Sequence, residues 1–190
     1  MRSLMLIGIT FLWALFTPVL PAPQPKPDID FEALAARVHE LVNAERDLEK
    51  IAPLKLDDRL IELARSHSAD MAVRDYVAHF TPEGLSPTDR AKKAGFSCTA
   101  QPFDNSFPLD IGENIFMSYL YTTYEIREVN DEEKRTYNWK DFETMAREIV
   151  DSWMHSAGHR ENILTRDYRY AGIGMAADTD YRLFVTQTFC

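Results

Sequence analysis

The chain has 190 residues, of which 45% are hydrophobic and 27% charged, which is enough for one globular domain with a full hydrophobic core. Its 21 basic and 30 acidic residues give a formal net charge of −9. This acidic balance, without a cluster of lysine and arginine, argues against nucleic acid as a partner, because phosphate neutralisation supplies most of that affinity. It also argues against attraction to a membrane surface through charge.

The first 22 residues have the layout of a secretory signal. Arg2 precedes an apolar run over residues 4–16, and a proline-containing break that ends in Ala22 follows it. We therefore expect residues 1–22 to be a signal peptide and the protein to be secreted. Because Leu20 is bulky where a small residue is preferred, the alternative is an uncleaved signal anchor, which would hold the domain on the outer side of the membrane.

A proline-rich linker, residues 23–29, follows and is expected to be extended. The folded domain is then expected to occupy residues 30–190. Apolar residues that recur at three- to four-residue spacing from Phe31 to Leu48 predict an amphipathic helix, with Asp28 or Asp30 as its N-cap and its end at Pro53.

Two more helix starts are visible before the middle of the chain. Asp57 or Asp58 begins a second amphipathic helix. Ser86 begins a short third one, because a serine, a proline at the next position and Asp89 three residues on form a helix-start pattern. Gly95 is expected to close this helix.

The second half of the chain supplies the strands. A strand is predicted over residues 111–121, and a charged insertion at about 121–140 is interpreted as an exposed loop. A long helix is expected from residue 142 to a break at Gly158. Two further strands follow, Tyr170–Ala177 and residues 181–190. Helices on both faces of such a small sheet predict an α+β fold, a three-layer α-β-α sandwich with a small central antiparallel sheet.

The chain has two cysteines, Cys98 and Cys190. In an exported protein an even pair favours a disulfide, and two unpaired thiols are the alternative. The bridge would close a loop of about 90 residues and stabilise the fold by about 4 kcal/mol in the chain-entropy model. Because no Cys-x-x-Cys is present, a zinc ribbon and a dithiol redox motif are excluded.

Two segments concentrate the polar chemistry. Residues 153–164 read W-M-H-S-A-G-H-R-E-N-I-L, and residues 112–115 read G-E-N-I. The spacing of His155 and His159 resembles a metalloprotease helix, but Ser156 stands where that motif needs a glutamate. Ser156 is also not part of a Gly-x-Ser-x-Gly elbow. Neither of these two motifs therefore identifies a catalytic residue.

Taken in order, the motifs resemble those of the CAP superfamily of cysteine-rich secretory, antigen 5 and pathogenesis-related proteins, in its prokaryotic SCP-like branch. The resemblance covers nearly all of residues 35–190. It rests on Asn43-Ala-Glu-Arg46, His67-Ser-x-Asp70-Met71, His79, the G-E-N-I segment, the W-M-H-S-A-G-H-R segment, Ala171-Gly-Ile-Gly174 and the final Thr186-Gln-x-Phe189.

The resemblance implies an α-β-α sandwich whose cleft gathers His79, Glu113, Ser156 and His159. Ser156 occupies the position where eukaryotic members usually carry a glutamate. Two imidazoles and one carboxylate are a plausible ligand set for zinc, so His79, His159 and Glu113 are expected to bind a divalent metal weakly. The alternative is that the same groups satisfy one another by hydrogen bonds, without a metal.

The function expected from these features is an exported, non-enzymatic CAP domain. It would bind a protein partner or a small apolar or lipid ligand outside the cytoplasm, and it requires no cofactor. Attachment to a membrane is expected through an uncleaved N-terminal anchor alone. The alternative is a metal-dependent hydrolase of the protease or nuclease type that uses His79, Glu113 and His159.

Overall fold

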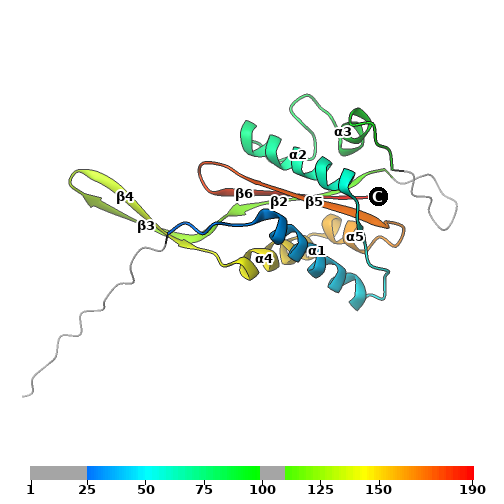
Figure 1. The fold of residues 1–190 in the computed structure, drawn as a ribbon, viewed down its shortest axis with the longest axis horizontal. Helices are drawn as coiled ribbons and strands as arrows, with labels where there is room; N and C mark the ends of the chain where they lie inside the picture. Colours follow the sequence, from blue (N-terminus) through cyan, green and yellow to red (C-terminus); the bar gives the residue numbers. More distant parts are fainter. Residues whose placement is uncertain (1–24, 99–109) are drawn as a thin grey trace, which may run out of the picture.

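The computed structural model, shown in Figure 1, describes residues 25–98 and 110–190. The predicted signal sequence, residues 1–22, lies outside the described residues, as do the first two residues of the linker. Within the described part of the chain, no helix is both long enough and apolar enough to cross a membrane.

A four-stranded sheet forms the middle layer, in the order β1-β5-β6-β2. Its three long strands, β2 (Gly112–Tyr119), β5 (Tyr170–Ala177) and β6 (Arg182–Phe189), pair antiparallel, as predicted. A two-residue strand, β1 (Lys55–Leu56), was not predicted and pairs with β5 in parallel. The sheet is therefore antiparallel except at this edge.

Helices cover both faces of the sheet, which confirms the predicted three-layer sandwich. Figure 1 shows α2 (Asp58–Arg74) and α3 (Pro87–Lys93) on one side of the sheet, and α1 (Phe31–Leu48), α4 (Phe142–His155) and α5 (Ala157–Leu164) on the other. The main hydrophobic core lies between the sheet and this second group of helices. Its fully buried members include Leu34, Val38, Val42, Ile149, Trp153 and Ile163.

Helix α2 lies unusually close to the sheet, because β5 carries glycine where the helix crosses it. A Cβ atom on Gly172 would lie 2.1 Å from the backbone nitrogen of Ile61, and one on Gly174 would lie 2.0 Å from that of Arg65. The Ser68 hydroxyl uses this proximity to donate to the carbonyl of Gly174 at 2.9 Å. The sequence A-G-I-G of β5 thus fixes the height of α2 above the sheet.

The predicted helix starts are confirmed. For the first two helices, where two N-cap residues were possible, the structure selects one. Asp30 caps α1 and Asp57 caps α2 through their carboxylates. Ser86 and Asp89 form a full capping box at the start of α3. After α3, Gly95 has φ = 76°, a left-handed conformation that favours glycine.

The motif Asn43-Ala-Glu-Arg46 is structural. The fully buried Arg46 donates to the carbonyls of Ala52, Ile163 and Thr165 at 2.8, 2.6 and 2.9 Å. Its guanidinium therefore ties α1 to the loop that follows it and to the end of α5.

The charged insertion at 121–140 is exposed, but the prediction of a loop was wrong. The segment is a β-hairpin of β3 (Tyr121–Val129) and β4 (Glu132–Trp139), which form a separate two-stranded sheet. Between them Asn130 and Asp131 have φ values of 54° and 63°, as a type I′ hairpin turn requires. The hairpin forms because alternate side chains place aromatic rings on one face, where they pack in cross-strand pairs.

The predicted helix break at Gly158 was also wrong. Helix α4 ends at His155, and Ser156 is extended, with φ = −97° and ψ = 120°. Helix α5 then begins at Ala157 and contains Gly158. A glycine inside a helix costs about 0.5–1 kcal/mol relative to alanine, and burial of Ile163 from the same helix in the core offsets that cost.

Candidate functional site

Glu113 is at the centre of a polar cluster at the start of β2. Its side chain is 1% exposed. The preceding Gly112 leaves room for the ring of Tyr168, because a Cβ atom there would lie 2.5 Å from the Tyr168 hydroxyl oxygen. The glycine thus lets β2 pack closely on Tyr168 just before the carboxylate.

Both oxygens of the Glu113 carboxylate have partners within the chain. Oε1 lies 3.0 Å from Nδ1 of His79, which follows α2. Oε2 forms an ion pair with Nη2 of Arg90 on α3, whose side chain is only 11% exposed. Arg90 also donates through Nη1 to the carbonyl of His79 at 2.7 Å. Arg90 therefore connects α3 to both His79 and Glu113.

His67 on α2 is a further member that the sequence did not reveal. Its Nε2 lies 2.9 Å from the carbonyl of Ala78 and 3.9 Å from Oε1 of Glu113. Burial lowers the pKa of His67 below its usual value, against the opposing effect of the Glu113 charge. The neutral ring donates from Nε2 to Ala78, and within the described residues its buried Nδ1 has no hydrogen-bond partner.

His159 faces the cluster from α5. The centroid of its ring is 6.2 Å from that of His79, and the two rings meet edge to face. Burial, together with the nearby His79, lowers the pKa of His159 below its usual value. Its imidazole is therefore held in the neutral form to lower pH than a free histidine.

Two asparagines fix the position of His159 relative to Glu113. The amide of Asn162 on α5 donates to the backbone carbonyl of Glu113 at 3.1 Å and to Oδ1 of Asn114 at 2.9 Å. The amide of Asn114 in turn donates to the carbonyl of His159 at 3.1 Å. These bonds join α5 to β2 and so hold His159 near Glu113.

Ser156, the fourth predicted member, stands at the junction of α4 and α5. It is the first residue before α5, but its hydroxyl does not cap that helix. Its role beside a ligand stays a prediction.

The described residues contain no group of three or more histidine, cysteine, aspartate or glutamate side chains that is arranged to hold a metal ion. The ion pair with Arg90 already occupies one oxygen of the Glu113 carboxylate with a fixed positive charge. Weak binding of zinc by His79, Glu113 and His159 stays a prediction.

Next to the cluster, an open groove runs between α2 and α3. Its volume is about 970 Å³. His67 and Arg90 line it, whereas Glu113 and the two other histidines do not. The rest of its lining combines apolar side chains with charged ones, including Leu63, Val73, Leu85, Ala91, Phe96, Arg59, Glu62, Asp70 and Arg74.

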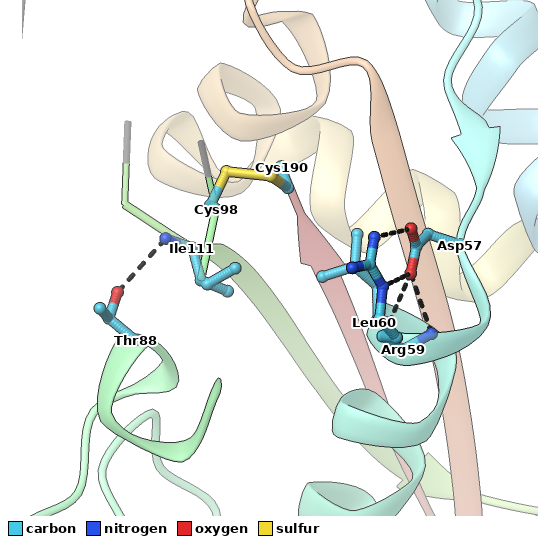
Figure 2. The surroundings of a disulfide bond; sticks show 7 residues. All are labelled: Asp57, Arg59, Leu60, Thr88, Cys98, Ile111 and Cys190. Atoms are coloured by element: carbon cyan, nitrogen blue, oxygen red, sulfur yellow. Dashed lines mark hydrogen bonds and ion pairs between the residues drawn. A yellow bond between two sulfur atoms is a disulfide. The ribbon is translucent and has the colours of Figure 1, made fainter. Parts of the chain in front are cut away.

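A disulfide fixes the segment after α3 to the sheet, as Figure 2 shows. Cys98 is bonded to Cys190 at the end of β6, with their Cα atoms 5.4 Å apart, which confirms the predicted bridge. The Thr88 hydroxyl on α3 also accepts a hydrogen bond from the backbone of Ile111 at 3.3 Å. A small hydrophobic cluster surrounds the bridge and consists of Leu60, Leu63, Ala91, Ile111 and Cys190, with Phe96 and Cys98 beside it.

With its sandwich and cleft, this chain belongs to the CAP family. Residues 39–189 match the model of the cysteine-rich secretory protein family, CAP. The match covers almost the whole described domain and confirms the resemblance inferred from the motifs.

Relatives of known sequence or structure agree with this assignment. The chain is 30% identical over 142 residues to the protein YkwD of Bacillus subtilis, a match that covers 75% of this chain but 42% of that protein. It shares the fold of an outer surface protein of Borrelia burgdorferi, with a TM-score of 0.59, 17% identity, and 85% and 94% of the two chains covered. An extracellular protein of Bacillus anthracis that contains an SCP domain has a TM-score of 0.56 and 23% identity, with 83% and 40% covered.

Proposed function

We propose that this chain is a non-enzymatic binding module that works outside the cytoplasm and takes a small apolar or lipid ligand in the groove between α2 and α3. The observation that carries the proposal is the groove itself. Its volume of about 970 Å³ lies at the upper end of the range of about 300–1,000 Å³ that small-molecule sites occupy. Among its mixed lining, Leu63, Val73 and Phe96 provide the apolar contacts that such a ligand needs.

The polar cluster has a different role in this proposal. Because Glu113 is neutralised by Arg90 and bonded to His79, its carboxylate is not poised to accept a proton from a substrate. The cluster instead holds α3 against β2. It therefore maintains the distance between α3 and α2, and with it the width of the groove.

The extracytoplasmic location is supported by three independent features. The N-terminal sequence has the layout of a secretory signal. The Cys98–Cys190 disulfide is of a kind that persists in oxidising compartments. Proteins that share the fold are described as an outer surface protein and an extracellular protein.

A fluorescent fatty acid, dansyl-undecanoic acid, tests the groove directly. Ala69 on α2 lines the groove and is exposed, so Ala69→Trp should fill the space without disturbing the core. We expect saturable one-to-one binding by the native protein and its loss in Ala69→Trp. The matched control is Ala33→Trp, at an exposed position of α1 outside the groove. Equal binding by both variants would locate the ligand elsewhere, and no binding by the native protein would refute the proposed ligand class.

A metal-dependent hydrolase that uses His79, Glu113 and His159 is the second candidate. The observation that favours it is the pair of facing imidazoles, because the lowered pKa of His159 keeps that ring neutral, as metal ligation requires. A structure of the protein NaASP2 with Zn²⁺ shares this fold, with a TM-score of 0.51 and 14% identity. Stoichiometric zinc in the purified protein that is lost in His159→Ala would favour this candidate over the binding module.

A further inference from the structure

One face of the β3–β4 hairpin continues onto the main sheet as a connected set of aromatic rings, here called the aromatic surface. Its members are Tyr119, Tyr121, Tyr124, Tyr137, Trp139 and Tyr181. The ring centroids of Tyr121 and Tyr137 are 4.9 Å apart, and those of Trp139 and Tyr181 are 5.0 Å apart. Tyr119 and Tyr124 remain 43% and 45% exposed. A two-stranded hairpin is marginal in water by itself, so contact with the body through these rings stabilises it.

The N-terminal linker reaches this surface. The ammonium of Lys26 lies 5.3 Å from the centre of the Tyr181 ring, a cation–π contact. Three residues further on, Ile29 packs against the main core just before α1 begins. Figure 1 shows the start of the described chain, in dark blue, beside the base of the hairpin. The route of the linker is thus fixed from the core to the edge of the aromatic surface.

We propose that the aromatic surface is a binding site for the chain's own proline-rich linker, residues 23–27. In this segment every second residue is a proline, namely Pro23, Pro25 and Pro27. Such segments adopt the polyproline II helix, which has no internal hydrogen bonds and loses little entropy on binding. Aromatic-lined surfaces are the usual receptors for this conformation.

The dimensions and charges agree with this occupant. Polyproline II rises about 3.1 Å per residue, so two residues in this conformation span about 6 Å. That is enough to pass from Tyr181 to Tyr137, whose ring centroids are 5.1 Å apart. Lys26 is the one basic residue of the segment, and the hairpin carries five acidic and three basic side chains. The linker would therefore hold the base of the hairpin to the body and set the direction in which the N-terminal segment leaves the domain.

The test is nuclear magnetic resonance on the purified protein with its linker intact and its prolines isotopically labelled. We expect cross-peaks between the ring protons of Tyr137 or Trp139 and the side chains of Pro23 and Pro25. These cross-peaks should disappear in Tyr137→Ser and persist in Tyr137→Phe, which keeps the ring. Absence of the cross-peaks from the native protein overturns the proposal.

Two controls keep the result interpretable. Thr123 lies on the opposite face of the hairpin, so Thr123→Ser should leave the cross-peaks unchanged. Tyr137→Ser removes a ring that stabilises the hairpin, so a second variant changes the linker instead. Pro23→Ser together with Pro25→Ser leaves the hairpin sequence intact and should shift the Trp139 ring resonances. An unchanged Trp139 spectrum in that variant contradicts the proposal. So do cross-peaks that arise between labelled and unlabelled molecules, because they would show a second copy on the aromatic surface.

Discussion

The polar cluster and the groove lie side by side and share His67 and Arg90, yet they use their polar groups in opposite ways. In the cluster, the Glu113 carboxylate has a partner on each oxygen. The groove instead presents an open surface of mixed apolar and charged side chains. The comparison indicates that the histidines and the carboxylate of these motifs hold α3 in its position against β2. The groove is lined mostly by residues outside the motifs, with His67 and Asp70 as the exceptions.

The largest expected effect comes from breaking the cluster at its centre. Glu113→Gln leaves the buried Arg90 without its counter-charge, and removal of one partner of a buried pair costs about 3–5 kcal/mol. We expect the urea midpoint of unfolding to fall accordingly and binding of dansyl-undecanoic acid to weaken, because α3 loses its attachment. The matched control is Glu49→Gln, which breaks the exposed pair with Arg160 outside the groove and should change little. An unchanged midpoint in Glu113→Gln would show that the ion pair does not hold α3.

The disulfide is the second attachment of the groove wall. Removing a native disulfide typically costs about 2–5 kcal/mol, so Cys98→Ser should lower the free energy of unfolding by that amount. Probe binding should weaken as well, because Phe96 and Ala91 border both the bridge and the groove. Cys190→Ser should give the same loss, and the double variant should lose no more than either single one. Additive losses would mean that the two cysteines act separately.

The dependence of stability on pH tests the burial of the histidines. Because the pKa values of His67 and His159 are lowered in the folded protein, the unfolded chain binds more protons below about pH 6.5. Their full contribution to stability is therefore present above that pH and is lost as the pH falls. Urea midpoints between pH 5 and 8 should show this decline. His67→Gln should make it shallower, while His155→Gln, at an exposed position, should reproduce the native curve.

The smallest expected effect concerns zinc. With Arg90 on the Glu113 carboxylate, calorimetry should detect weak binding at most. If Ser156 lies beside the two imidazoles as predicted, Ser156→Glu adds a carboxylate there and should tighten zinc binding, whereas His159→Ala should abolish it. Binding should also fade as the pH falls, because a ligand imidazole must be neutral; the lowered pKa of His159 places the protonation of that ring below the range of a free histidine, about pH 6.5. If His159→Ala binds zinc as well as the native protein does, the cluster has no role in metal binding.

Local signals in the sequence were sufficient for most of the fold. The caps at Asp30, Asp57 and Ser86 depend on residues within one helical turn, and the strands β5 and β6 on their own apolar pattern. The hairpin was missed because its charges dominate the segment. Its Asn130-Asp131 turn and the aromatic residues that alternate on one face would have revealed it.

The site was predictable only in part, because its contacts are long-range. His79, Glu113 and His159 were found through the motifs, and the structure places all three in one cluster. Arg90 was missed, since nothing within its own helix indicates a carboxylate 23 residues further along the chain. His67 was recognised only as part of a motif, because its distance to Glu113 depends on how closely α2 approaches the sheet.

The hairpin turn at Asn130 and Asp131 also has a practical consequence. It lies at the exposed tip of a separate sheet, and Figure 1 shows it at the opposite end of the molecule from α3. Exposed turns of small polar residues tolerate insertions well. A short tag placed between these two residues would immobilise the protein with its groove facing the solution, so that ligands could be screened on a surface without blocking the site.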